Sequence, residues 1–119
     1  VRARVRSVKK EDGKYYYDPA APLSTFCWGR EDSGRCQAED FEKPNGEWNT
    51  LELICYGDEA IHIVNGEVVM RVKQPEFFNG NAWIPMNKGK LQIQSEAAET
   101  FFKNIRIRPV DRAAFAKYN

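Results

Sequence analysis

The chain has 119 residues and a formal net charge of +1 at pH 7, so it has the size of one domain with a single modest core. This balance of charge gives no field that attracts nucleic acid or acidic lipid, and no window approaches the roughly 18 apolar residues of a membrane span. We therefore predict one domain over residues 1–119 that binds no nucleic acid and has no membrane span.

The N-terminal third predicts short strands separated by turn residues. Breaks fall at Asp12-Gly13, at the proline-containing segment 19–22 and at Ser33-Gly34, which are turn signals. Arginines and lysines of the first strand alternate with valines, and this pattern is typical of a strand with one solvated face rather than a phosphate-binding tail. The predicted strands are RARVRSV (2–8), KYYYD (14–18), LSTFCW (23–28) and RCQAEDF (35–41).

The cysteine pattern argues against a structural zinc site, because no C-x-x-C occurs and the chain has one histidine. Cys27 and Cys36 flank a glycine-containing loop, and both a disulfide and two buried free thiols are open readings of that pair. The odd count leaves Cys55 unpaired in either case. No cofactor motif is present and none is expected.

The middle of the chain contains the clearest hairpin. Asn65-Gly66 separates two β-branched runs, which predicts a type I′ turn. Such a turn would pair Val64 with Glu67, Ile63 with Val68, and Ile61 with Met70. The predicted core face is Ile61, Ile63, Val68, Met70 and Val72, with His62, Glu67 and Arg71 on the other face. The preceding run 48–56 predicts a strand paired to this hairpin.

The C-terminal third predicts a loop, two strands and a short helix. Residues 74–87 lack alternation and predict a long surface loop, whereas 89–95 and 100–110 alternate and predict an antiparallel hairpin turning at 96–99. A helix is expected after Asp111, a suitable N-cap. Many short strands at close spacing are typical of an antiparallel all-β sandwich or barrel.

Three features could carry chemistry. Trp83, with Phe77 and Phe78 nearby, suits stacking on a sugar ring, and the alternative is that these rings cover a small core. Carboxylates beside amides suit glycosyl chemistry, which commonly needs two carboxyl groups, although each alone is most often a solvated turn residue. The lone His62 titrates near neutral pH, yet a surface role is its commoner fate. The carboxylates and amides are Glu31, Asp32, Gln92, Gln94, Glu96 and Glu99.

Two long segments resemble a known family. They are EKPNGEWNTLELICYGDEAIHIVNGEVVMR (42–71) and KGKLQIQSEAAETFFKNIRIRPV (88–110). Their ordered elements are Gly46-Glu47-Trp48-Asn49, Asn65-Gly66, Gly89 with Leu91 to Glu96, and Asn104-Ile105-Arg106. Together they closely resemble the second half of the 3-keto-disaccharide hydrolase domain, formerly a domain of unknown function. Ala97-Ala98 stands where many relatives keep a glycine.

That resemblance implies a concanavalin-like jelly roll in bacteria that degrade glycans, in a periplasmic or secreted location. The opening strands of the family are not matched, so the implied sandwich is incomplete in this chain. A missing N-terminal segment, a second chain or a homo-oligomer would complete it. The partner it implies is a carbohydrate.

The implied activity is cleavage of a glycosidic bond in a sugar oxidised at C3. We assign Glu96 as the general base, Gln92 and Gln94 as hydroxyl-binding groups and Trp83 as a stacking platform, with Glu31, Asp32 and His62 as further substrate contacts. A divalent ion on Glu31 or Asp32 is an open alternative. Two rival functions remain: a non-catalytic carbohydrate-binding module of the lectin or laminin-G type, and a structural or assembly module.

Overall fold

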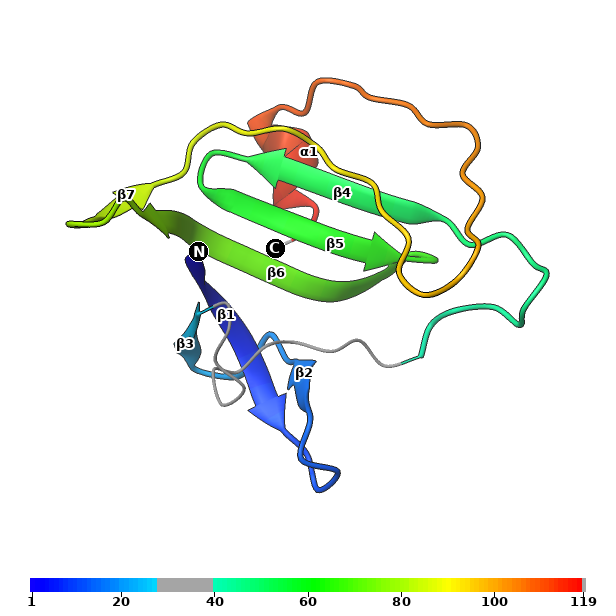
Figure 1. Ribbon diagram of the computed structural model, residues 1–119, viewed down its shortest axis with the longest axis horizontal. Coiled ribbons are helices and arrows are strands. Elements are labelled where there is room, and N and C mark those ends of the chain that lie inside the picture. Colours follow the sequence, from blue (N-terminus) through cyan, green and yellow to red (C-terminus); the bar gives the residue numbers. More distant parts are fainter. Residues whose placement is uncertain (28–39, 119) are drawn as a thin grey trace.

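A computed structural model describes residues 1–27 and 40–118. The elements in chain order are β1 (Arg2–Lys9), β2 (Tyr15–Tyr17), β3 (Leu23–Cys27), β4 (Leu51–Tyr56), β5 (Glu59–Val64), β6 (Glu67–Phe78), β7 (Trp83–Pro85) and α1 (Arg112–Ala116) (Figure 1). The predicted class, all-β with a short C-terminal helix, is confirmed. Most of the strand predicted at 35–41, with Ser33-Gly34 and Cys36, lies outside the described residues. The helix that the structure describes is far too short to cross a membrane.

The described strands form one seven-stranded sheet in the order β2-β1-β6-β5-β4, with β3 added to β1 and β7 to β6. Each strand pairs with its neighbours in the antiparallel sense. This topology does not close into a barrel and is consistent with the β-sandwich class. β4 is the terminal strand of the order.

The β5–β6 hairpin has the predicted turn. Asn65 and Gly66 both have positive φ, 50° and 88°, as a type I′ turn requires. The pairs Val64–Glu67 and Ile63–Val68 are confirmed. Asn65 can adopt the left-handed backbone conformation of this turn because its short polar side chain can hydrogen-bond locally.

Beyond these two pairs the predicted register is wrong. The ladder shifts between His62 and Ile63, so that His62 faces Met70 and Ile61 faces Arg71. A β-bulge of this kind places one extra residue, here Val69, in one strand, and every later side chain changes face. Met70 therefore leaves the predicted core face and Arg71 joins it. Alternation alone could not reveal the shift, because Val68, Val69 and Met70 are three consecutive apolar residues.

Helix α1 covers the face of β4–β6 that carries Ile61, which we name the helix face. Ile61 and Ile63 are buried there with Phe115, and Ile54, Val68, Val110 and Tyr118 pack around them. The predicted N-cap is confirmed, since the Asp111 carboxylate accepts a hydrogen bond from the Ala114 amide at 2.7 Å. The opposite, open face of β4–β6 carries Leu51, Leu53, Cys55, His62 and Met70.

Residues 74–87 do not form the predicted long loop. β6 continues to Phe78 and pairs with β7, so that Phe78 faces Trp83 and Glu76 faces Pro85. The Asn79 side chain closes the turn by accepting hydrogen bonds from the amides of Asn81 and Ala82, both at 2.9 Å. The prolines and the asparagines suggested an irregular loop, but Pro75 lies within β6, Pro85 ends β7, and Asn79 and Asn81 lie in the turn between these strands.

The two strands predicted at 89–95 and 100–110 are absent, because residues 86–110 contain no helix or strand. In Figure 1 the yellow part of this connection passes across β4 and β5, and the orange part then follows an arc outside the sheet to α1. Its apolar residues are exposed; Phe101 is 70% and Ile107 95% accessible. Alternation lets a segment form a strand, but a strand also needs a neighbouring strand to pair with, and among the described residues this segment pairs with none.

Candidate functional site

Trp83 lies on β7 and contacts this chain's own N-terminal strand. The Arg2 guanidinium lies 4.3 Å from the centroid of its ring, and Arg2 Nε also donates to Glu76 Oε2 at 2.5 Å. The ring of Phe78 packs against Trp83 at 5.4 Å, tilted by 45°. One side of the indole therefore takes part in a cation–π contact, and a sugar would have to stack on the other side.

Gln92 and Gln94 lie side by side on the exposed 86–110 connection. The Gln92 amide Nε2 is 3.4 Å from Gln94 Oε1, so the two amides point the same way as alternation predicts. Glu96 follows on the same exposed segment. No hydrogen bond or ring contact among the described residues joins Trp83 to this group. The structure thus brings the two glutamines together and does not bring Trp83 to them.

His62 lies half-buried in the open face, opposite Leu53 on β4 and Met70 on β6. Burial between these apolar neighbours lowers the pKa of its imidazole below the ordinary 6.5. The residue is neutral at physiological pH, when its nitrogens can donate and accept hydrogen bonds but carry no charge.

Glu31 and Asp32, the other predicted substrate contacts, lie outside the described residues. Within residues 1–27 and 40–118, no group of three or more histidine, cysteine, aspartate or glutamate side chains is placed to hold a metal ion. Cys55 is an exposed thiol on β4.

Asn65 has a structural role that the sequence reasoning missed. Its side-chain oxygen accepts from the Thr50 amide at 2.9 Å, and its nitrogen donates to the Phe41 carbonyl at 2.7 Å and to Asn49 Oδ1 at 2.9 Å. Asn49 in turn accepts from the Lys43 amide at 2.8 Å. Two signature asparagines therefore tie the segment before β4 to the β5–β6 turn. Their turn-forming chemistry was visible in the sequence, but their partners were not.

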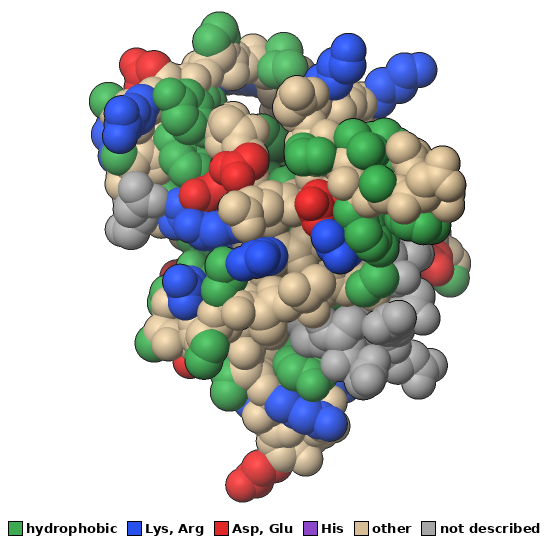
Figure 2. Space-filling view, turned by 90° about the vertical axis from the view of Figure 1, so that its left-hand side faces the viewer, with side chains coloured by type: hydrophobic (Ala, Val, Ile, Leu, Met, Phe, Trp, Pro, Cys, Tyr) green, Lys and Arg blue, Asp and Glu red, His purple; other side chains and the backbone are tan. Residues whose placement is uncertain are grey.

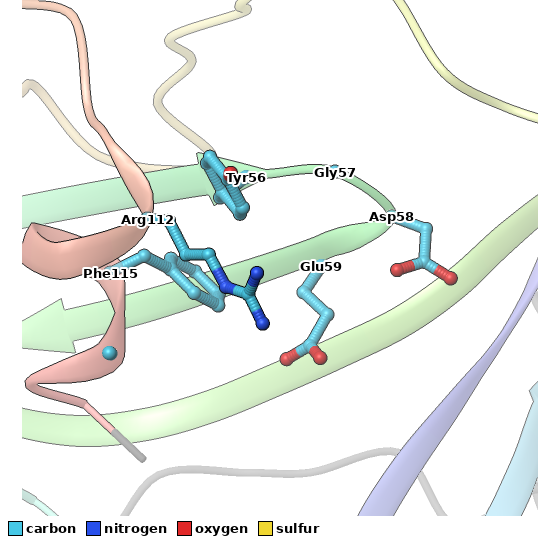
Figure 3. A pocket seen from close by; sticks show the side chains of 7 residues that line it. Tyr56, Gly57, Asp58, Glu59, Arg112 and Phe115 are labelled. Atoms are coloured by element: carbon cyan, nitrogen blue, oxygen red, sulfur yellow. The ribbon is translucent and has the colours of Figure 1, made fainter.

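A pocket of about 390 Å³ opens where α1 meets the β4–β5 turn. Figure 3 shows the Arg112 side chain between the aromatic rings and Glu59, while Asp58 sits at the far side of the turn. The rings of Tyr56 and Phe115 stack with centroids 5.4 Å apart. Aromatic carbon with a guanidinium and carboxylates is a combination that suits a hydroxylated ligand. The lining residues are Tyr56, Gly57, Asp58, Glu59, Arg112, Phe115 and Ala116.

Glu59 at this pocket is held as a carboxylate. Arg71 reaches its Oε2 through Nε at 2.8 Å and Nη2 at 2.7 Å, and Lys73 reaches Oε1 at 3.0 Å. Burial raises the pKa of Glu59, but the hydrogen bonds from Lys73 and Arg71 outweigh it and lower the pKa below its ordinary value. A carboxylate so stabilised is a weak proton acceptor, so Glu59 suits ligand binding better than general-base catalysis.

Arg71 occupies this position because of the β-bulge. Its guanidinium lies 5.4 Å from the Phe115 ring centroid and donates to the Tyr118 carbonyl at 2.9 Å. Without the register shift the side chain would lie on the open face, as the sequence reasoning placed it. The bulge therefore places Arg71 where it forms the ion pair with Glu59 and contacts the Phe115 ring of α1.

The fold is an antiparallel β-domain with polar groups at its surface. Its described residues contain no cluster of side chains that could hold a metal ion. The match to a family model then specifies it further: residues 5–108 match the 3-keto-alpha-glucoside-1,2-lyase-like domain, and the chain belongs to this family. The resemblance seen in the sequence is thereby confirmed. No curated protein and no solved structure matched the chain.

Proposed function

We propose that the chain cleaves glycosides of 3-keto sugars. The observation that carries this proposal is the family match over residues 5–108, since the family's description names a lyase chemistry on a 3-keto-alpha-glucoside. The adjacent amides of Gln92 and Gln94 support it, because such a pair suits the hydroxyl groups of a sugar. By the same resemblance, the activity would be exercised in the periplasm or outside the cell.

The chemistry is an elimination followed by hydration. A C3 ketone acidifies the hydrogen on C2, so a general base can take that proton. The electron pair of the C2–H bond forms a C1=C2 double bond while the C1–O bond breaks, and the leaving oxygen takes up a proton. Water then adds across the double bond, its hydroxyl to C1 and its proton to C2. The sum is hydrolysis, and no redox partner is consumed.

Glu96 is the base in this proposal, and Gln92 and Gln94 bind sugar hydroxyls. Trp83 stays a proposed stacking residue, on the ring side that Arg2 leaves open, but no contact among the described residues joins it to this group. Glu96 is exposed, so its carboxylate can reach a substrate that settles on the 86–110 connection. Since removal of a general base typically costs about 10²–10⁴-fold in rate, the assignment has a large expected effect.

The test is turnover of a nitrophenyl 3-keto-glucoside, followed by the absorbance of released nitrophenol. Glu96→Gln should lower kcat at least about 100-fold, whereas the matched Glu99→Gln, three residues further along the same exposed segment, should stay within about twofold. Undiminished turnover by Glu96→Gln would remove Glu96 from the mechanism. Absence of turnover by the unaltered chain would remove the catalytic function.

A second candidate, sugar binding without turnover, is favoured by the pocket at Tyr56 and Arg112. Its half-open aromatic ring and charged rim are the groups that lectin-like sites use. Binding to an immobilised glycan panel would then fall about tenfold or more in Tyr56→Ala, a loss expected for removal of a stacking ring, while Tyr15→Ala on β2 would leave it unchanged. Equal losses in both variants would exclude the pocket.

A further inference from the structure

The pocket between α1 and the β4–β5 turn contains a cation without a counter-ion. Arg112 is exposed at the start of α1, and its side chain makes no ion pair or hydrogen bond with another described residue. The charge of Glu59 is already offset by Arg71 and Lys73. In Figure 3 the Asp58 carboxylate is directed away from the Arg112 guanidinium. The pocket therefore presents a guanidinium that an anionic ligand can pair with.

Arg112 projects from a helix that is fixed at both ends. The Asp111 carboxylate caps the first turn, and the Tyr118 carbonyl accepts a hydrogen bond from Arg71 at 2.9 Å just after the last turn. Between them Phe115 is buried in the core cluster. Because Asp111 occupies the amide at the start of the helix, the pocket offers a ligand side chains and not helix backbone. A group held on a fixed element loses less conformational freedom when it binds.

The pocket also has an aromatic wall with an open side. The Phe115 ring stacks against the Tyr56 ring, with centroids 5.4 Å apart, and supports it from the core. Tyr56 is 39% exposed, so part of its surface is accessible to a ligand. Its hydroxyl has no hydrogen-bond partner within the described part of the chain. A tyrosine in this setting combines an apolar ring with a polar tip, which suits the C–H face and the hydroxyls of a pyranose.

Glu59 contributes one further hydrogen-bond acceptor. A carboxylate has about four acceptor positions. Arg71 donates to Oε2 through Nε and Nη2, and Lys73 Nζ contacts Oε1, so a position on Oε1 is left for a ligand hydroxyl. The cavity volume of about 390 Å³ lies within the range of sites that hold small molecules. A cation, an aromatic ring and a hydroxyl acceptor therefore surround one cavity.

We propose that this pocket binds an acidic sugar unit, a uronate whose carboxylate pairs with Arg112, whose ring packs on Tyr56 and whose hydroxyl donates to Glu59. The inference rests on the second candidate function above, sugar binding at this pocket, and adds the class of sugar. A planar guanidinium matches a carboxylate through two parallel hydrogen bonds, and a neutral hydroxymethyl group cannot reproduce them. α1 follows residues 5–108, the range that matches the family model, so the pocket combines a turn of the matched domain with a helix outside the matched range.

Long-range attraction does not account for such a preference. The formal net charge is +1, and Figure 2 shows basic and acidic side chains interspersed over the face that it presents. Exposed charges are screened beyond about 8 Å at physiological ionic strength. Selectivity for an anion must then come from the cation in the pocket itself. Lys117, the exposed C-cap of the same helix, does not line the pocket and is the matched control.

The test is calorimetric titration of the whole chain with trigalacturonate and with its methyl ester, which keeps the rings and hydroxyls but removes the negative charges. The chain should bind the acid at least about tenfold more tightly than the ester, as expected for hydrogen bonds to a charged group. Arg112→Gln should reduce this preference to within about twofold without altering the circular dichroism, whereas Lys117→Gln should keep it. Tyr56→Ala should weaken both ligands about tenfold.

The outcomes separate this proposal from the function on which it rests. Equal affinity for the acid and the ester would overturn the proposal and leave sugar binding at the pocket intact, as would binding of neutral glycans without trigalacturonate. A loss of preference in Lys117→Gln as large as in Arg112→Gln would assign it to general electrostatic attraction and contradict the proposal. If neither trigalacturonate, its ester nor a neutral glycan panel binds, the second candidate function fails and the proposal fails with it.

Discussion

The sheet around β1, β5 and β6 and the 86–110 connection carry the same kind of sequence and reach opposite outcomes. Val5 and Ile61 are 1% and 0% exposed, whereas Ile107 is 95% exposed. Val5 and Ile107 each lie between two arginines in a run that alternates apolar with basic residues. Alternation therefore specifies a face for each side chain, whereas burial depends on a partner strand or helix that supplies the other half of the contact.

Alanine substitutions of two isoleucines should distinguish the sheet from the 86–110 connection by their effect on the free energy of unfolding. Ile61→Ala removes a side chain that is fully buried under Phe115, and it should lower the free energy of unfolding by about 2–5 kcal/mol. Ile107→Ala removes the same atoms from an exposed site and should change it by no more than about 0.5 kcal/mol. Urea unfolding of both variants measures the contrast. Similar losses at the two positions would mean that residue 107 is packed in solution.

Asn65 offers the next effect, because it combines a left-handed backbone with three side-chain hydrogen bonds. Asn65→Ala should cost about 2 kcal/mol through backbone strain and lost hydrogen bonds. Asn65→Gly keeps the backbone conformation accessible and should recover about half of that loss. A glycine variant no better than alanine would show that backbone strain contributes little there. Thermal unfolding followed by circular dichroism ranks the three proteins.

The cap of α1 should contribute less. Asp111→Ala leaves the Ala114 amide without its acceptor and should destabilise the fold by about 1 kcal/mol, loosening the helix that covers Ile61. Asp111→Ser restores a capping oxygen and serves as the matched control. Comparable unfolding midpoints for the alanine and serine variants would contradict a capping role.

The smallest effect is a pH dependence at Glu59. Its folded pKa lies below the ordinary 4.5, so the carboxylate contributes stability that is fully present above the unfolded value and is lost as pH falls through the folded value. Glu59→Gln should flatten the loss of stability on acidification below pH 4.5. Glu67→Gln, at an exposed carboxyl without an ion pair among the described residues, should keep the wild-type slope. A slope that Glu59→Gln leaves unchanged would show that the ion pair with Arg71 and Lys73 does not form.

Much of the fold could be predicted from local signals. Asn65-Gly66 determined the hairpin and its first two pairs, Asp111 determined the start of α1, and alternating basic residues predicted β1. The bulge at Val69 could not be predicted, because valine fits either face of the strand equally well. The β6–β7 hairpin was hidden by Pro75 and the asparagines, whose side-chain hydrogen bonds become evident only in three dimensions.

The candidate site was less accessible to sequence reasoning. Gln92 and Gln94 were predicted to point together because they are two residues apart in an extended run, and the structure has them in contact. The cation–π contact of Arg2 with Trp83 joins the first described strand, β1, to the last, β7. No local sequence pattern predicts a pair so far apart in the chain. The same is true of the pocket between Tyr56 and Arg112, which requires the packing of α1 on β4.

The most direct test of this account is residue-resolved hydrogen exchange of the unmodified chain, since it reports pairing along the whole backbone. Amides of β5 and β6 should be protected by several orders of magnitude, as expected for the most stable core strands of a fold. Amides of 89–95 and 101–108 should exchange close to the rate of an unstructured peptide. Equal protection in both regions would contradict the account, because the connection would then already be part of a completed sheet.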